Sequence, residues 1–115
     1  MILACVDDLM FMSKIKTAAA IRGVTVTFAK SPDAALADMR REPPSLVILD
    51  LNSVRLDPIA LVAAMRGDPA LSSISTVGFV SHVRADVIEA AREAGVGEVM
   101  ARSAFVERLG EILSR

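Results

Sequence analysis

Short apolar segments alternate with longer amphipathic segments along the whole chain. The apolar segments are rich in β-branched residues and contain no regular polar positions, which is typical of strands buried on both faces of a sheet. They cover residues 2–6, 24–29, 46–49, 76–80 and, more weakly, 96–101. After each segment, apolar residues recur at three- and four-residue spacing, which predicts a helix with one buried face. The pattern therefore predicts five βα units in succession.

Residues that favour helix ends stand where the predicted helices begin and end. Ser31 and Asp57 each precede a proline, which places a capping residue before the first helical position. Gly23, Gly67 and Gly95 stand where helices should stop. Successive βα units form an open parallel sheet, and the common five-stranded order of this class is 2-1-3-4-5. We therefore predict an α/β fold, a flavodoxin-like doubly wound five-stranded parallel sheet of strand order 2-1-3-4-5 with helices on both faces.

The composition fits one globular domain over residues 1–115. With 115 residues, of which 53% are hydrophobic and 23% charged, the chain is neither disordered nor long enough for two domains. Its 13 basic and 14 acidic side chains exclude a strongly basic nucleic-acid-binding domain. The single cysteine, Cys5, cannot form an internal disulfide and favours a reducing, cytoplasmic setting. The apolar start of the chain is too short for a signal peptide or a membrane span.

Charged and polar residues gather where the predicted strands end, which is the edge where ligands bind in parallel sheets. Asp7 and Asp8 follow the first strand, Asp50 ends the third, Ser81 follows the fourth and Arg102 the fifth. Three carboxylates on neighbouring strands repel one another unless a cation lies among them or one is protonated. Mg²⁺ suits such a site, because it takes oxygen ligands and bridges to phosphate. With a metal, a carboxylate can accept a phosphoryl group, and Asp50 is the best placed nucleophile.

The chain resembles the receiver domain of bacterial two-component response regulators. Three stretches carry the resemblance: Val6-Asp7-Asp8 is similar to the acidic pair of that family, Val47 to Asn52 to its phosphoacceptor strand, and Val80-Ser81 to its switch hydroxyl. They stand in the family's order and at its intervals, and the resemblance extends from residue 1 to about residue 113.

The resemblance implies a mechanism and a set of partners. A histidine kinase or phosphotransfer protein would phosphorylate Asp50. Mg²⁺, bound weakly, would be held by the carboxylates of Asp7, Asp8 and Asp50 and by the backbone carbonyl of Asn52. Ser81 would act as the switch hydroxyl that responds to phosphorylation.

Several positions depart from the family pattern. Val54 stands where the family has a proline, Val99 at the position of its aromatic switch residue, and His82 where a small residue follows the hydroxyl. Arg102 replaces the lysine that contacts the phosphoryl group, and Ser103 replaces the proline after it. The aromatic coupling of the family therefore has no ring to move at residue 99.

Arg102 has several possible partners. It could contact a phosphoryl group as the lysine does, or hold Asp50 in a permanent ion pair, because a guanidinium can clamp a carboxylate through two parallel hydrogen bonds. The plainer interpretation is a surface pair with Glu98 or with a carboxylate at a strand end. Plainer interpretations also exist for the other positions: solvated loop charges for the aspartates, turn residues for Ser81 and His82, and core filler for the methionines, including Met10.

Three functions are compatible with these residues. We favour a stand-alone, non-enzymatic receiver, because the nucleophile, both acidic residues and the hydroxyl are present, and we expect no room for an output domain. The second is a degenerate receiver, an interaction module recognised without phosphorylation. The third, a small phosphatase-type enzyme working through an aspartyl phosphate, is disfavoured because no segment is long enough for a substrate-covering cap. A flavin or nucleotide binder is disfavoured because no glycine-rich loop follows the first strand.

The resemblance also implies a protein-binding surface. In the receiver family the face made by helix 4, strand 5 and helix 5 typically binds the downstream protein, and the same face often mediates homodimers. It corresponds here to residues 84–94, 98–101 and 105–113. Neither direct nucleic-acid binding nor membrane attachment is expected. Because Val99 lacks a ring, we expect a shallow apolar surface at this face.

Overall fold

The strands and helices lie where the apolar pattern predicts them. The computed structural model describes residues 1–81 and 84–115. The strands are β1 (Ile2–Cys5), β2 (Val26–Phe28), β3 (Leu46–Asp50), β4 (Thr76–Val80) and β5 (Glu98–Ala101). The helices are α1 (Leu9–Arg22), α2 (Pro32–Arg41), α3 (Pro58–Arg66), α4 (Ala85–Ala94), α5 (Arg102–Glu107) and α6 (Leu109–Leu113).

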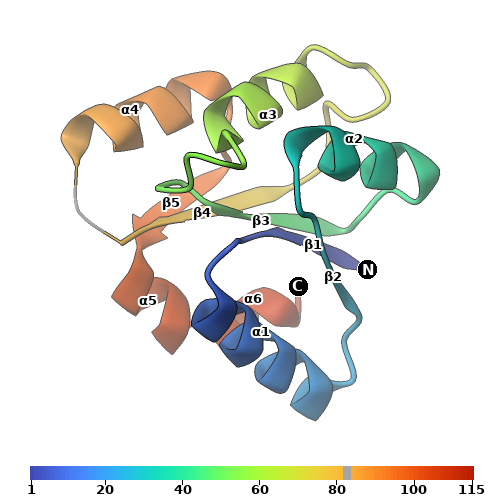
Figure 1. Cartoon of the computed structure of the whole chain (residues 1–115), viewed down its shortest axis with the longest axis vertical. Helices are drawn as coiled ribbons and strands as arrows, with labels where there is room; N and C mark the ends of the chain where they lie inside the picture. Colours follow the sequence, from blue (N-terminus) through green and yellow to red (C-terminus); the bar gives the residue numbers. More distant parts are fainter. Residues whose placement is uncertain (82–83) are drawn as a thin grey trace.

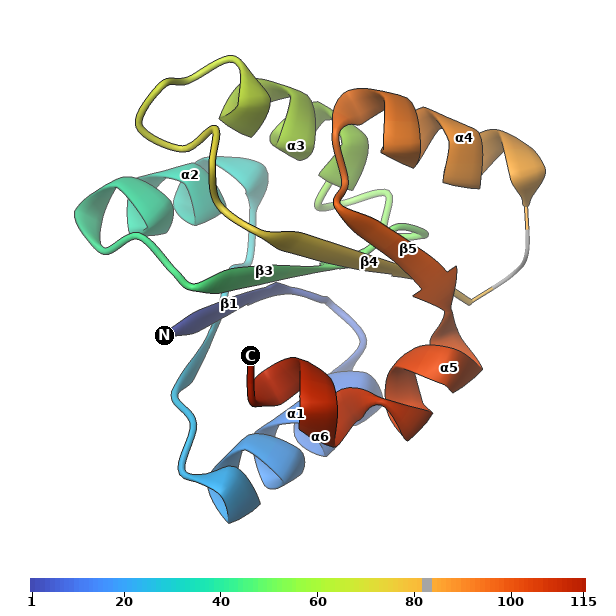
Figure 2. The same cartoon turned by 180° about the vertical axis from the view of Figure 1, so that it is seen from behind.

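The five strands form one parallel sheet of order β2-β1-β3-β4-β5. Helices α2, α3 and α4 cover one face and α1, α5 and α6 the other (Figures 1 and 2). The predicted fold class and strand order are therefore confirmed. The predicted last helix is in fact two, because the backbone leaves the helical region at Arg108 (φ −97°, ψ 6°).

Two apolar layers, one on each face of the sheet, make up the core. Successive residues of a strand point to opposite faces, so in β3 Val47 and Leu49 pack with α2, α3 and α4, while Leu46 and Ile48 pack with α1, α5 and α6. Both sets are buried. This two-sided burial explains why the strands read as continuous apolar runs without alternating polar positions.

The helix ends follow the sequence signals with one exception. Ser31 Oγ accepts a hydrogen bond from Ala34 N (3.1 Å) and caps α2 as predicted. Gly23 ends α1 and Gly95 ends α4, both in the left-handed region that favours glycine. The prediction that Asp57 caps α3 is wrong: its φ is 41°, so it lacks the extended backbone that directs a capping oxygen at the first turn, and its side chain makes no capping bond.

Three phenylalanines form a cluster in which the rings of Phe79 and Phe105 are stacked and that of Phe11 is tilted against both. The ring centroids of Phe11 and Phe79 are 4.6 Å apart, and those of Phe79 and Phe105 are 4.9 Å apart. They join α1, β4 and α5 into one apolar layer. Met10, the residue before Phe11, faces outward with 84% of its surface exposed, so its interpretation as core filler is wrong, whereas Met39 is fully buried.

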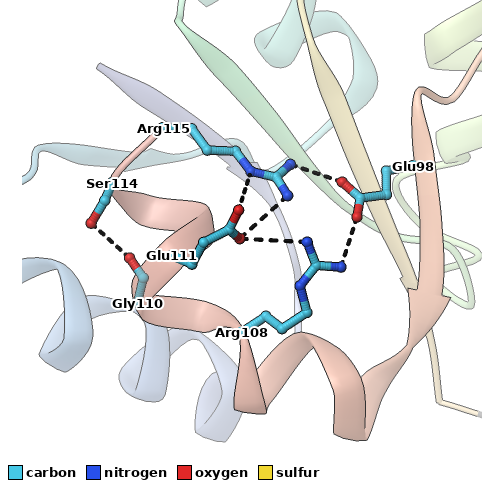
Figure 3. Close-up of polar contacts among 6 residues, drawn as sticks. All are labelled: Glu98, Arg108, Gly110, Glu111, Ser114 and Arg115. Carbon is cyan, nitrogen blue, oxygen red and sulfur yellow. Dashed lines mark hydrogen bonds and ion pairs between the residues drawn. The ribbon is translucent and has the colours of Figure 1, made fainter.

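A ring of four charges ties the last helix to the edge strand. Arg108 and Arg115 each pair with both Glu98 on β5 and Glu111 on α6, at distances from 2.8 to 3.6 Å (Figure 3). Glu98 therefore has one partner just before α6, Arg108, and one just after it, Arg115. Within the described residues, no helix combines the length and the apolar character needed to cross a membrane.

Candidate functional site

A chain of hydrogen bonds links the polar residues at the carboxyl edge of the sheet. Asp8 pairs with Arg102, Arg102 contacts Ser81, Ser81 binds Asn52, and Asn52 binds Asp50. The structure thus brings together the residues that the sequence singles out on four different loops. Asp7 lies beside them, and its negative charge acts on Asp50. His82 lies outside the described residues.

Asp50 is the most buried carboxylate of the site. It is the last residue of β3, only 8% of its surface is exposed, and its Oδ1 accepts a hydrogen bond from Asn52 N (3.0 Å). Burial raises its pKa, and the negative charges of Asp7 and Asp8 act in the same direction. The Asn52 N–H and the positive charge of Arg102 oppose this rise without cancelling it. A cation added beside Asp50 would relieve this unfavourable charge.

Asp8 uses both of its carboxylate oxygens within the protein. Its Oδ1 accepts a hydrogen bond from Phe11 N (3.1 Å) and caps α1, and its Oδ2 accepts one from Arg102 Nη2 (3.3 Å). The pKa of Asp8 is lowered, chiefly by the Phe11 N–H and further by Arg102. Asp8 is therefore the cap of α1 as well as a site residue. The capping role was not predicted, because Asp7 and Asp8 are adjacent and either could have capped the helix.

Asp7 is positioned by a residue that the sequence analysis missed. Ser53 is buried in the loop after β3, and its Oγ donates to Asp7 Oδ2 (3.0 Å) while accepting a hydrogen bond from Leu56 N (3.2 Å). The hydroxyl thus connects the loop after β1 to the loop after β3. A serine in a polar loop carries no periodic or spacing signal, so only the fold shows this contact.

Arg102 begins α5 and reaches back across the site. It donates to Asp8 Oδ2 and to Ser81 Oγ (3.4 Å), and its Cζ lies 4.3 Å from the centroid of the Phe11 ring. Of the partners considered from sequence, the structure shows a strand-end carboxylate, Asp8. It shows no ion pair with Asp50, and Glu98 is held by other arginines.

Asn52 contributes its side chain as well as its backbone. Its Oδ1 accepts a hydrogen bond from Ser81 N (2.5 Å), while its own N–H donates to Asp50. From the sequence, only its backbone carbonyl was expected at the site. This hydrogen bond joins the loop after β3 to the residue after β4 and holds the backbone of Ser81 in place.

Several solved structures that resemble the chain over nearly all of its length are response regulators. The response regulator from Hahella chejuensis has a TM-score of 0.86 at 20% identity, covering 98% of this chain and 91% of that one. The Mn²⁺-bound form of response regulator Rcp1 has a TM-score of 0.83 at 19% identity, covering 98% and 91%. The phosphorylated cyanobacterial phytochrome response regulator RcpA has 0.78 at 24%, covering 97% and 86%. Comparisons with protein-family models and with curated proteins give no match.

The chain has the fold of a response regulator receiver domain. At the positions where it departs from the receiver pattern, Val54 is 94% exposed in the loop after β3, and Ser103 is exposed at the start of α5. Val99 is half-buried on β5 and packs against the layer that includes Val87 and Ile88 of α4. Val99 therefore lies at the edge of the hydrophobic core.

The donor atoms of this receiver-type site suit a hard divalent cation, but their arrangement does not yet form a cage. Carboxylates and a backbone carbonyl are the ligands that Mg²⁺ takes. The pKa of Asp50 is raised first by burial and further by the negative charges of Asp7 and Asp8. Within residues 1–81 and 84–115, however, no three His, Cys, Asp or Glu side chains gather closely enough to hold a metal. Asp8 is engaged by Arg102 and Phe11, and Asp7 by Ser53.

Proposed function

We propose that the protein is a response regulator receiver that accepts a phosphoryl group on Asp50 from a histidine kinase or phosphotransfer protein. The observation that carries the proposal is the environment of Asp50. It is a buried carboxylate at the end of β3 with a raised pKa, and the charges of Asp7, Asp8 and Arg102 act on it. A higher pKa makes the ionised carboxylate more basic and more nucleophilic. The receiver fold of the chain supports the same proposal.

The geometry assigns roles to individual atoms. Asp50 Oδ1 accepts the Asn52 N–H, whereas Oδ2 has no hydrogen bond from any described residue, so Oδ2 is the oxygen that attacks phosphorus. The new O–P bond forms as the P–N bond of the donor phosphohistidine breaks, and the imidazole leaves with the bonding electron pair. Ser81 and Arg102 are donors at the same edge and can bind the phosphoryl oxygens. Mg²⁺, when bound, neutralises carboxylate and phosphoryl charge.

The test is direct phosphorylation of the purified chain. Incubation with phosphoramidate and Mg²⁺ should add the mass of one phosphoryl group, seen by intact-mass spectrometry. Asp50→Asn should abolish the adduct, and Asp57→Asn, an exposed aspartate in the following loop, should retain it. Absence of an adduct under conditions that modify an ordinary receiver would reject the proposal.

One observation favours the second candidate function, a degenerate receiver. Arg102 already neutralises Asp8, so the acidic edge is partly satisfied without a metal or a phosphoryl group. A chain that never takes up a phosphoryl group would signal through its surface alone. The same mass measurement separates the two functions, because only the first predicts an adduct.

We further propose that the protein acts in the cytoplasm and signals through contacts of the α4, β5 and α5 face with a downstream protein or a second copy. Val99 of β5 and Ile88 of α4 are half-buried and pack against the core. Sedimentation of phosphoramidate-treated protein should reveal any dimer, and Val99→Asp should weaken it if this face is used. A dimer unaffected in a folded Val99→Asp variant would place the interface elsewhere.

A further inference from the structure

The guanidinium of Arg102 is held from three directions at the edge of the site. It donates to Asp8 Oδ2 at 3.3 Å and to Ser81 Oγ at 3.4 Å, and its Cζ lies 4.3 Å from the Phe11 ring centroid. A planar guanidinium can donate in two directions and rest on an aromatic face at once. A lysine ammonium, a compact and strongly hydrated point charge, fits this combination less well.

Arg102 and a divalent cation need the same carboxylate. Asp8 Oδ1 is used by Phe11 N, so Oδ2, which Arg102 occupies, is the oxygen left for a metal. A guanidinium and a divalent cation repel each other, and both cannot bind one oxygen atom closely.

We propose that Arg102 is an internal counter-ion that competes with divalent cations for Asp8: the carboxylate is shared in alternation between the guanidinium and the metal, so metal binding displaces Arg102 from Asp8 and from the face of Phe11. The inference rests on the proposed function only in placing the metal at Asp8 and Asp50. It makes Phe11, rather than a residue at position 99, the aromatic ring whose contacts change when the site is occupied.

The surroundings of Arg102 allow this movement. Its side chain is 36% exposed, and it borders a cavity of about 180 Å³ lined by Asp8, Met10, Phe11, Lys14, Arg102 and Val106. The contacts that hold it are individually weak, since partly exposed ion pairs and cation–π contacts contribute little each. Because Arg102 is the first residue of α5, its release changes how that helix is anchored to α1.

The experiment measures metal binding alone. Free Mn²⁺ is counted by electron paramagnetic resonance while the full chain is titrated, for the wild type, Arg102→Gln and Lys14→Gln. Lys14→Gln is the matched control: it removes one positive charge from the same cavity, and Lys14 forms no ion pair with Asp8. We expect Arg102→Gln to bind Mn²⁺ about tenfold more tightly, because its competing contacts are lost, and Lys14→Gln to change the affinity much less.

Arg102→Lys supplies a rescue test. Lysine restores the positive charge but cannot donate to Asp8 and Ser81 while its charged group lies flat on the Phe11 ring. The Mn²⁺ affinity of Arg102→Lys should therefore lie between those of the wild type and Arg102→Gln. The inference is overturned if Arg102→Gln binds no Mn²⁺, if its affinity equals the wild type's, or if Lys14→Gln tightens binding equally. Circular dichroism and thermal melts confirm that each variant is folded.

A second readout follows Arg102 itself. In the wild type its side-chain protons should show nuclear magnetic resonance shifts displaced by the Phe11 ring current, and saturating Mg²⁺ should remove this displacement. Mg²⁺ binding with unchanged Arg102 signals overturns the inference. Tighter Mn²⁺ binding by Arg102→Gln in a chain that takes up no phosphoryl group supports the inference and rejects the proposed function. If Asp50 is phosphorylated and Arg102→Gln binds Mn²⁺ with the affinity of the wild type, the proposed function is supported and the inference is rejected.

Discussion

Packing next to Asp50 gives a sharp prediction at Gly78. This residue is in the middle of β4, where a Cβ would lie 2.8 Å from Leu51 Cδ1 and 2.9 Å from Leu51 Cγ. Such contacts are too short, so Gly78→Ala must displace Leu51, which is buried and directly follows Asp50. The perturbation therefore reaches both the core and the site.

The expected cost follows from two opposing terms. Forcing extra volume into a packed core costs about 1–3 kcal/mol, and replacing glycine by alanine in a strand returns about 0.5–1 kcal/mol. Taking the middle of each range, Gly78→Ala should lose about 1 kcal/mol of unfolding free energy. At roughly 4 °C per kcal/mol for a domain of this size, the melting temperature should fall by about 4 °C.

The assay is urea and thermal unfolding followed by far-ultraviolet circular dichroism, because the chain has no Trp or Tyr. Gly67→Ala is the matched control. Its backbone φ of −82° suits any residue, and the nearest atom to a new Cβ is Ala63 O at 3.5 Å. It should be neutral or stabilising by about 0.4–1 kcal/mol.

A double variant tests the cause. Leu51→Ala removes the side chain that Gly78→Ala would strike, so the pair should be less destabilised than the sum of the single changes, by at least about 0.5 kcal/mol. The packing argument is refuted if Gly78→Ala is as stable as Gly67→Ala. Strict additivity of the two changes would equally contradict it.

Three further predictions concern charge and hydrogen bonding. The pKa of Asp50 is raised above its ordinary value of 3.8, so just above that pH the folded chain binds more protons than the unfolded chain and loses stability as pH rises. Asp50→Asn should therefore melt at a higher temperature than wild type at neutral pH, by a margin that shrinks as pH falls toward 3.8. Equal melting curves at neutral pH would contradict this. Ser53→Ala leaves the buried Leu56 N–H without its partner and should cost about 1–3 kcal/mol in urea unfolding, with Ser13→Ala, an exposed serine on α1, as a neutral control. Arg66→Ala removes hydrogen bonds to the carbonyls of residues 72, 74 and 95 and to the hydroxyl of residue 76 and should cost about 2–4 kcal/mol, whereas a loss under 1 kcal/mol would show that water replaces those bonds.

The strand pattern, the strand order and the placement of the site residues were predictable from the sequence. Continuous apolar runs separated by amphipathic segments are compatible with few arrangements besides a doubly wound parallel sheet. Once the sheet is parallel, every strand end comes to the same edge, so Asp7, Asp8, Asp50, Ser81 and Arg102 had to approach one another. The helix-ending glycines and the Ser31 cap were predictable for the same reason: their effects act over a few neighbouring residues.

Long side chains and loop conformations were decided only by the tertiary structure. Arg102 could reach several carboxylates, and the Phe11 ring beneath it together with the Asp8 carboxylate selects one of them. Asn52 binding Ser81 and Ser53 binding Asp7 both join loops far apart in the chain. Such contacts leave no periodic trace in the sequence, because their geometry depends on how close the folded loops come.

The same distinction separates the fold of this chain from the charge pairing at its acidic edge. Residue type and spacing determined a receiver-type sheet with an acidic edge, because burial and parallel topology act on every strand alike. Which charge neutralises which depends on distances of a few ångströms, where electrostatic interactions change steeply. The sequence by itself therefore determined that a carboxylate site exists at this edge, and only the packed structure decided that Arg102 occupies part of it.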